Sequence, residues 1–230
     1  MANMTTGALL TYLFGETTHP LSARLGKRLA ASPRFRAFVE EQRDKIRKKA
    51  RGVSDDEGLT DLHLELEVAH WLLRDRSCTL HYETYLAGKT RGPDFTVTFK
   101  GHTRFHVEVK RLRGAAAFAK WADAVCDKLG QLPAGSINVL LVAGEARGRG
   151  ALEAPSAMTR LHTLAERTDD AVFVRRRLHG ARDYLRQAQR LSGVVGWSGW
   201  NAEAEGWASL WLNRQAKHPI PPEIVRLLQA

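Results

Sequence analysis

The sequence predicts an α/β fold in which helices flank a central mixed sheet. The first observation is an apolar arc that recurs at helical spacing over residues 59–74. The second is alternation of apolar and polar side chains in residues 95–99 and 105–110, which is typical of half-buried strands. The third is a helical period over residues 115–132, followed by an apolar run at residues 137–142 that is typical of a buried strand.

Residues 1–53 are predicted to form a basic helical arm, which an acidic linker joins to a main domain at residues 54–230. Ser32 can cap the main helix of the arm, and Pro33 suits its first position. The end of this helix carries six cations, Arg43, Lys45, Arg47, Lys48, Lys49 and Arg51. Two interpretations stay open: the cations bind phosphates near a cleft, or they are a solvated helix end that the macrodipole favours.

The two alternating segments predict a β-hairpin whose turn lies at residues 100–103. If the hairpin closes at the centre of this turn, Asp94 falls opposite residue 109, give or take one position. Cross-strand neighbours lie about 5 Å apart, so the carboxylates of Asp94 and Glu108 are expected to converge. The period of two places Lys110 on the same face as Glu108. In the alternative interpretation, Glu108 and Lys110 are solvated residues on an open face.

Two acids on the helix at residues 59–74 have different predicted environments. Glu65 falls inside the apolar arc, whereas Glu67 falls outside it and is predicted to be a surface residue. Burying an unpaired carboxylate costs on the order of several kcal/mol, so Glu65 is expected to have a partner. That partner is either a metal ion or, alternatively, a nearby Arg or Lys in a salt bridge.

These residues together resemble the PD-(D/E)xK nuclease superfamily, which includes restriction endonucleases and Holliday-junction resolvases. The shared pattern is an acid on a first helix, Pro93-Asp94 opening a strand, and Glu108-Val109-Lys110 on the next strand. The resemblance covers roughly residues 59–141. It implies a restriction-endonuclease-like αβββαβ core, in which the first strand is expected at residues 80–87.

The resemblance also implies a catalytic site and a reaction. The site would consist of Glu65, Asp94, Glu108 and Lys110. Mg²⁺ or Mn²⁺ would be bound by Asp94, Glu108, the Val109 carbonyl group and Glu65, and would lower the pKa of a bound water. Lys110 would orient that water and offset the phosphoryl charge. The expected activity is metal-dependent endonucleolytic cleavage of DNA, in defence, repair or recombination.

The charge of the chain favours the same class of partner. Lys and Arg number 35 against 25 Asp and Glu, a formal net charge of +10, which attracts polyanions such as DNA. The residues expected to contact nucleic acid are Lys45, Arg47, Lys48, Lys49, Arg91, Arg111 and Arg113. Two alternatives stay open: a non-catalytic nucleic-acid-binding protein on the same fold, and an interaction subunit of a larger complex. Cutting both strands of a duplex would favour a homodimer.

The remaining sequence predicts further elements and a cellular compartment. Helices are expected at residues 157–167 and 181–190, and a further strand at residues 191–200. Another short apolar run follows at residues 207–213, and the tryptophans of these segments are expected in the core rather than stacked on bases. The two cysteines lack disulfide or zinc spacing, which suits a reducing cytosol. No stretch of about 20 apolar residues exists, so a cytoplasmic protein without a membrane segment is expected.

Overall fold

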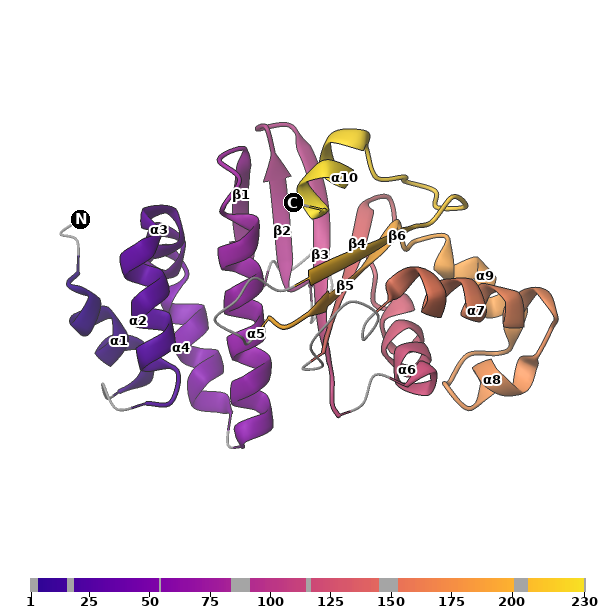
Figure 1. Cartoon of the computed structure of the whole chain (residues 1–230), viewed down its shortest axis with the longest axis horizontal. Helices are drawn as coiled ribbons and strands as arrows, with labels where there is room; N and C mark the ends of the chain where they lie inside the picture. Colours follow the sequence, from indigo (N-terminus) through magenta and orange to yellow (C-terminus); the bar gives the residue numbers. More distant parts are fainter. Residues whose placement is uncertain are drawn as a thin grey trace.

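A computed structural model describes residues 4–15, 19–53, 55–83, 92–114, 117–144, 153–200 and 207–229. Its centre is one six-stranded sheet in which strands that follow each other along the chain are also neighbours in space (Figure 1). The strands are β1 (Cys78–Tyr82), β2 (Phe95–Phe99), β3 (Thr103–Leu112), β4 (Ile137–Gly144), β5 (Gly193–Ser198) and β6 (Trp207–Leu212). The α/β class with a mixed sheet flanked by helices is therefore confirmed.

Helices connect the parallel strands and cover both faces of the sheet. The pairs β3–β4 and β4–β5 are parallel, and the other three neighbouring pairs are antiparallel. Parallel neighbours need long crossover connections. These contain α6 (Phe118–Leu129) between β3 and β4, and α7 (Ala154–Glu166), α8 (Asp170–Val174) and α9 (Ala181–Ala188) between β4 and β5.

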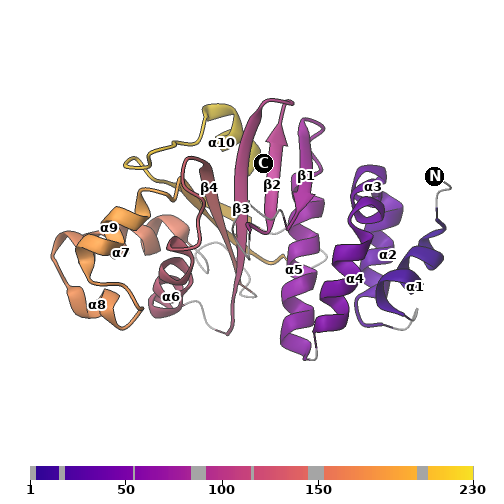
Figure 2. The ribbon, with the colours of Figure 1, turned by 180° about the vertical axis from the view of Figure 1, so that it is seen from behind.

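The remaining helices lie before β1 and after β6. They are α1 (Thr6–Phe14), α2 (Ser22–Ala31), α3 (Pro33–Glu41), α4 (Arg43–Gly52), α5 (Asp56–Leu72) and α10 (Pro222–Leu228). Together with one face of the sheet they bury a first apolar cluster, and α6–α9 bury a second cluster on the opposite face. Figure 2 shows α1–α4 and α6–α9 at opposite sides of the molecule. Alternation along β4 divides its side chains accordingly, with Val139 and Leu141 in the first cluster and Leu140 and Val142 in the second.

The predicted hairpin is confirmed. Its strands are paired with Phe95 opposite Val107 and Phe99 opposite Thr103. Lys100 and Gly101 adopt left-handed φ angles of 49° and 77°, which turn the chain between the strands. The strand expected at residues 80–87 is β1, which begins two residues earlier, and residues 84–91 lie outside the described part of the chain.

The N-terminal helices depart from the prediction at one point. Ser32 caps α3 by accepting a hydrogen bond from the Phe35 N–H group, as the sequence indicates. The single long helix expected after it is wrong, because Gln42 leaves helical geometry (φ −94°, ψ 9°) and separates α3 from α4. The break re-aims the chain, so that Phe38 of α3 and Ile46 of α4 both reach the first apolar cluster.

The helices before residue 53 share their core with the sheet. The Phe38 ring centroid lies 6.4 Å from those of Tyr82 in β1 and Phe95 in β2. The Arg34 guanidinium of α3 donates to the carbonyl groups of Leu73, Asp75 and Cys78, which join α5 to β1. The predicted boundary near residue 53 falls between α4 and α5, and apolar packing continues across it.

In the last third of the chain, the helices expected at residues 157–167 and 181–190 correspond to α7 and α9, the expected strand contains β5, and the apolar run at residues 207–213 forms β6, whereas α8 and α10 were not predicted. Trp200 is buried, and Trp197 and Trp211 pack against the two apolar clusters, so the expected core role of these rings is confirmed. Cys78 and Cys126 are both buried and free. In the described ranges, every helix is too short or too polar to cross a bilayer.

Candidate functional site

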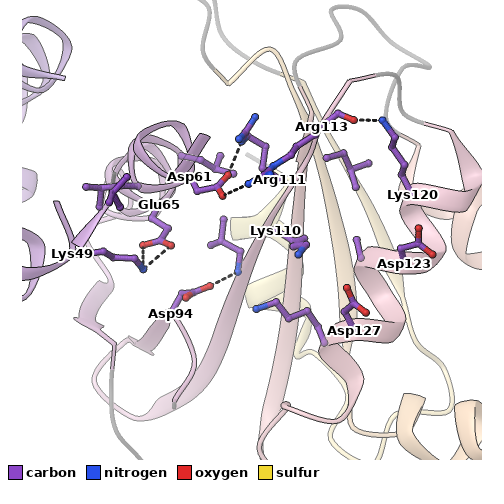
Figure 3. A pocket seen from close by; sticks show the side chains of 18 residues that line it. Lys49, Asp61, Glu65, Asp94, Lys110, Arg111, Arg113, Lys120, Asp123 and Asp127 are labelled. Atoms are coloured by element: carbon purple, nitrogen blue, oxygen red, sulfur yellow. Dashed lines mark hydrogen bonds and ion pairs between the residues drawn. The ribbon is translucent and has the colours of Figure 1, made fainter. Parts of the chain in front are cut away.

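A cleft of about 660 Å³ opens beside the C-terminal half of β3 (Figure 3). At this level β3 extends beyond its pairing with β2, so both α5 and α6 border the strand. Lys49, Glu65 and Asp94 lie on one side of the cleft, Lys110 lies in the middle, and Asp127 of α6 lies opposite. The cleft thus brings together side chains from α4, α5, β3, α6 and the residue before β2.

Asp94 lies at the point predicted for it. The pairing of Phe95 with Val107 sets Asp94 level with Glu108, within the one-residue margin of the prediction. Its Oδ2 atom accepts a hydrogen bond of 2.8 Å from the Val109 N–H group, which fixes the carboxylate at the edge of β3. Burial, followed by the carboxylates of Glu65 and Glu108, raises the pKa of Asp94 to about 7, against the opposing effect of the Lys128 ammonium.

Glu65 is buried on α5, and its partner is a lysine. The Lys49 ammonium group lies 2.8 Å from Oε1 and 2.7 Å from Oε2, and the Tyr82 hydroxyl group donates to Oε2. Burial raises the pKa of Glu65, and Lys49 works against that rise. The sequence left open either a metal ion or a basic side chain as the partner of Glu65, and the structure contains the salt bridge to Lys49.

Glu108 is buried on the α6 side of β3, which excludes the solvated open face for this residue. The Lys128 ammonium group of α6 donates to its Oε1 atom. Lys128 lines the cleft, whereas Glu108 does not reach the cleft surface. Lys110, two residues further along β3, is half-buried, lines the cleft and has no hydrogen bond or ion pair within the described ranges.

Lys49 and Lys128 are two cleft residues that sequence reasoning did not assign to the catalytic set. Each had a detectable signal, because each lies at helical spacing from apolar residues. Lys49 follows Ile46 by three residues on α4, and Lys128 follows Val125 by three residues on α6. A lysine on an apolar stripe indicates a buried charge that needs a partner.

Several cations expected to contact nucleic acid are already engaged within the protein. Lys45 donates to the Tyr82 carbonyl group at 2.6 Å, and the Arg47 guanidinium lies 4.4 Å from the ring centroid of Tyr12. Lys48, by contrast, is exposed and has no partner among the residues that the structure describes. Arg91 lies outside those residues.

Arg111 and Arg113 form ion pairs across one edge of the cleft. The Arg111 Nε atom lies 2.6 Å from Asp61, and the same guanidinium also contacts Glu57. Arg113 lies 2.9 Å from Glu57 and 3.3 Å from Asp61, although its side chain is 60% exposed. Acids on α5 therefore neutralise part of the positive charge expected at this edge.

The prediction that Glu67 is a surface residue is wrong. Glu67 is buried, and its carboxylate lies 3.0 Å from the Arg28 guanidinium of α2 and 3.5 Å from the His63 ring. Although burial opposes ionisation, hydrogen bonds from His63 and Arg28 lower the pKa of Glu67. The cause is the N-terminal helices, which cover the side of α5 that the apolar arc alone would leave in solvent.

The donor atoms at the cleft suit a hard divalent cation. Among the described residues, no three His, Cys, Asp or Glu side chains gather closely enough to hold a metal ion, and lysines engage Glu65 and Glu108. Mg²⁺, however, is commonly bound through one or two carboxylates and several waters. The Asp94 carboxylate and the Val109 carbonyl group, which line the cleft, are such donors, and Glu108 lies behind the cleft surface, level with Asp94. Burial, and then the carboxylates of Glu65 and Glu108, raise the pKa of Asp94, and a bound cation would favour its ionised form.

Comparisons with protein-family models, curated proteins and solved structures found no match for this chain.

Proposed function

We propose that this protein is a Mg²⁺- or Mn²⁺-dependent nuclease that hydrolyses phosphodiester bonds in DNA. The observation that carries the proposal is the buried Asp94 carboxylate, which lies level with Glu108 and lines one cleft together with Lys110. The order helix, three strands, helix, strand from α5 to β4 supports a restriction-endonuclease-like core. The net charge of +10 supports a polyanionic substrate.

Each residue of the site has a role that follows from its position. Asp94, Glu108 and the Val109 carbonyl group would hold the cation, and Lys128 would release Glu108 to it. The bound cation would lower the pKa of a coordinated water and neutralise charge on the phosphate. Lys110 lines the cleft and has no hydrogen-bond or ion-pair partner among the described residues, and its ammonium group would orient the attacking water and stabilise the developing negative charge.

Cleavage assays on supercoiled, linear and branched DNA with Mg²⁺ or Mn²⁺ test the proposal. We expect Asp94→Asn and Lys110→Ala each to lower the cleavage rate by about 100-fold or more, since each removes a charge that acts on the reacting phosphate. Asp127→Asn is the matched control, because Asp127 is an exposed acid of the same cleft. Undiminished cleavage by both Asp94→Asn and Lys110→Ala would contradict the proposal.

A further inference from the structure

Lys49 lies on α4, outside the segment that carries the nuclease motifs, yet its ammonium group reaches into the cleft (Figure 3). The neighbouring cations of α4 point elsewhere: Lys45 donates to the end of β1, and Lys48 is exposed. Lys49 instead lies on the inward side of the helix, three residues after the buried Ile46. A side chain of the N-terminal helices is therefore a part of the cleft wall.

The contacts of Lys49 use its whole donor capacity. Its Nζ atom lies 2.8 and 2.7 Å from the two carboxylate oxygens of Glu65 and 3.0 Å from Oε1 of Glu83. An ammonium group has three donors, so these three oxygens leave none for a substrate phosphate. Glu65 in turn receives a further hydrogen bond from the Tyr82 hydroxyl group, which fixes its carboxylate from a second side.

We propose that Lys49 is a positioning residue that withholds Glu65 from the metal ion, so that Asp94 and Glu108 alone supply carboxylate ligands. This inference rests on the proposed nuclease function and replaces Glu65 as an expected ligand. Both carboxylate oxygens of Glu65 are engaged, whereas among the described residues Lys128 contacts only Oε1 of Glu108, so Glu108 keeps an oxygen for the cation. A divalent cation with two carboxylates is formally neutral. A third carboxylate would leave a negative charge facing the phosphate and would displace a metal-bound water.

Calorimetric titration with Mn²⁺ at pH 8 tests this role. We expect Lys49→Met to bind Mn²⁺ roughly tenfold more tightly than wild type, because Glu65 is released and a nearby positive charge is lost. Glu65→Gln is expected to stay within about twofold of wild type. The double variant lacks the Lys49 charge but has no Glu65 carboxylate to release, so it should bind Mn²⁺ less tightly than Lys49→Met, and the difference isolates the contribution of Glu65. Lys49→Arg keeps a positive charge that can donate to the Glu65 carboxylate, so this variant should retain the wild-type affinity for Mn²⁺.

A second readout separates positioning from mere structural support. Lys49→Met should cleave DNA more slowly while binding Mn²⁺ more tightly, whereas a structural lysine would lose affinity, activity and thermal stability together. Lys48→Met is the matched control for the titration, since it removes the same charge from an exposed position on the same helix. Its Mn²⁺ affinity should equal that of wild type.

Three outcomes overturn the inference. One is a loss of about tenfold or more in Mn²⁺ affinity for Glu65→Gln, which would make Glu65 a ligand. Another is a well-folded Lys49→Met variant whose Mn²⁺ affinity is unchanged or weaker. If Lys49→Met does not fold, the double variant takes its place, because it leaves neither buried charge unpaired. The Mn²⁺ affinity of Glu65→Gln then decides whether Glu65 is a ligand. A wild-type protein that binds no Mn²⁺ would instead contradict the proposed function, and this inference with it.

Discussion

Asp94 illustrates, at the scale of one residue, how a buried carboxylate is held in an unfavourable state. Its carboxylate is buried beside Glu65 and Glu108, and its only direct hydrogen bond in the described part of the chain comes from the Val109 N–H group. Burial and like charges favour the protonated form, which explains the pKa of about 7. Such a group destabilises the fold at neutral pH, and the proposed binding of a cation would offset this effect.

The raised pKa of Asp94 predicts how stability depends on pH. The unfolded chain loses this proton near pH 4, whereas the folded protein keeps it to about pH 7, so the stabilising contribution fades as the pH rises between these values. Asp94→Asn has no carboxyl group to ionise, so the variant does not lose stability in this way as the pH rises. We expect the variant to match wild type near pH 4 and to exceed it at pH 8 by on the order of a few kcal/mol.

Thermal unfolding of wild type and Asp94→Asn at both pH values measures this difference without added metal. Asp127→Asn, an exposed acid of the same cleft, serves as the control and should track wild type at each pH. A destabilised Asp94→Asn variant at pH 8 would show that other groups of the fold compensate the Asp94 carboxylate, and it would contradict the raised pKa of this group.

Residue-scale partners were the least predictable part of the site. Alternation along residues 105–110 correctly predicted the side of β3 on which Glu108 lies, and the turn signal set Asp94 beside it. Periodicity could indicate that Lys49 and Lys128 are buried, but not which acids they engage, because they reach Glu65 and Glu108 across 16 and 20 positions of the chain. Such contacts depend on how helices pack, which local periodicity does not encode.

At the scale of elements, Arg34 joins the N-terminal helices to the cleft-forming part of the fold. Its guanidinium group extends from α3 and donates to carbonyl groups of Leu73 and Asp75, after α5, and of Cys78 in β1. Carbonyl groups at the end of a helix lack partners within the helix, so a charged donor from outside stabilises them. The contact also fixes where α5 ends relative to the sheet.

Arg34→Met should therefore destabilise the protein by about 1–3 kcal/mol, since it leaves three carbonyl groups without this donor. For a chain of this length, such a loss lowers the melting temperature by roughly 2–4 °C per kcal/mol. Arg24→Met on α2 is the control, because Arg24 is exposed and has no partner in the described ranges. Equal melting temperatures for the two variants would contradict the role assigned to Arg34.

Elements with strong periodicity were predicted well, and breaks between elements were not. The sequence predicts β2 with its observed bounds, and α5 to within about one turn of the observed Asp56–Leu72. The start of α5 was missed because Asp55, which caps it through the Gly58 N–H group, lies before the apolar arc begins. The break at Gln42 was missed because no Gly or Pro marks it; tertiary packing of α3 and α4 determines it.

At the scale of the whole molecule, the N-terminal helices and the sheet form one packed unit around the cleft. Figures 1 and 2 show α1–α4 beside α5 and β1, where their apolar side chains enter the same cluster. This arrangement buries Glu67 and brings Lys49 to Glu65. The boundary predicted at residue 53 from composition could not reveal either contact, because both depend on how the helices before residue 53 dock against α5.

Calorimetric titration of wild type, Glu108→Gln and Asp127→Asn with Mn²⁺ tests whether Asp94 and Glu108 form a metal site. We expect wild type and Asp127→Asn to bind one ion with equal affinity, and Glu108→Gln to bind at least about tenfold more weakly, since a carboxylate ligand is lost. Equal heats for all three proteins, or no heat for wild type, would contradict a metal site formed by Asp94 and Glu108.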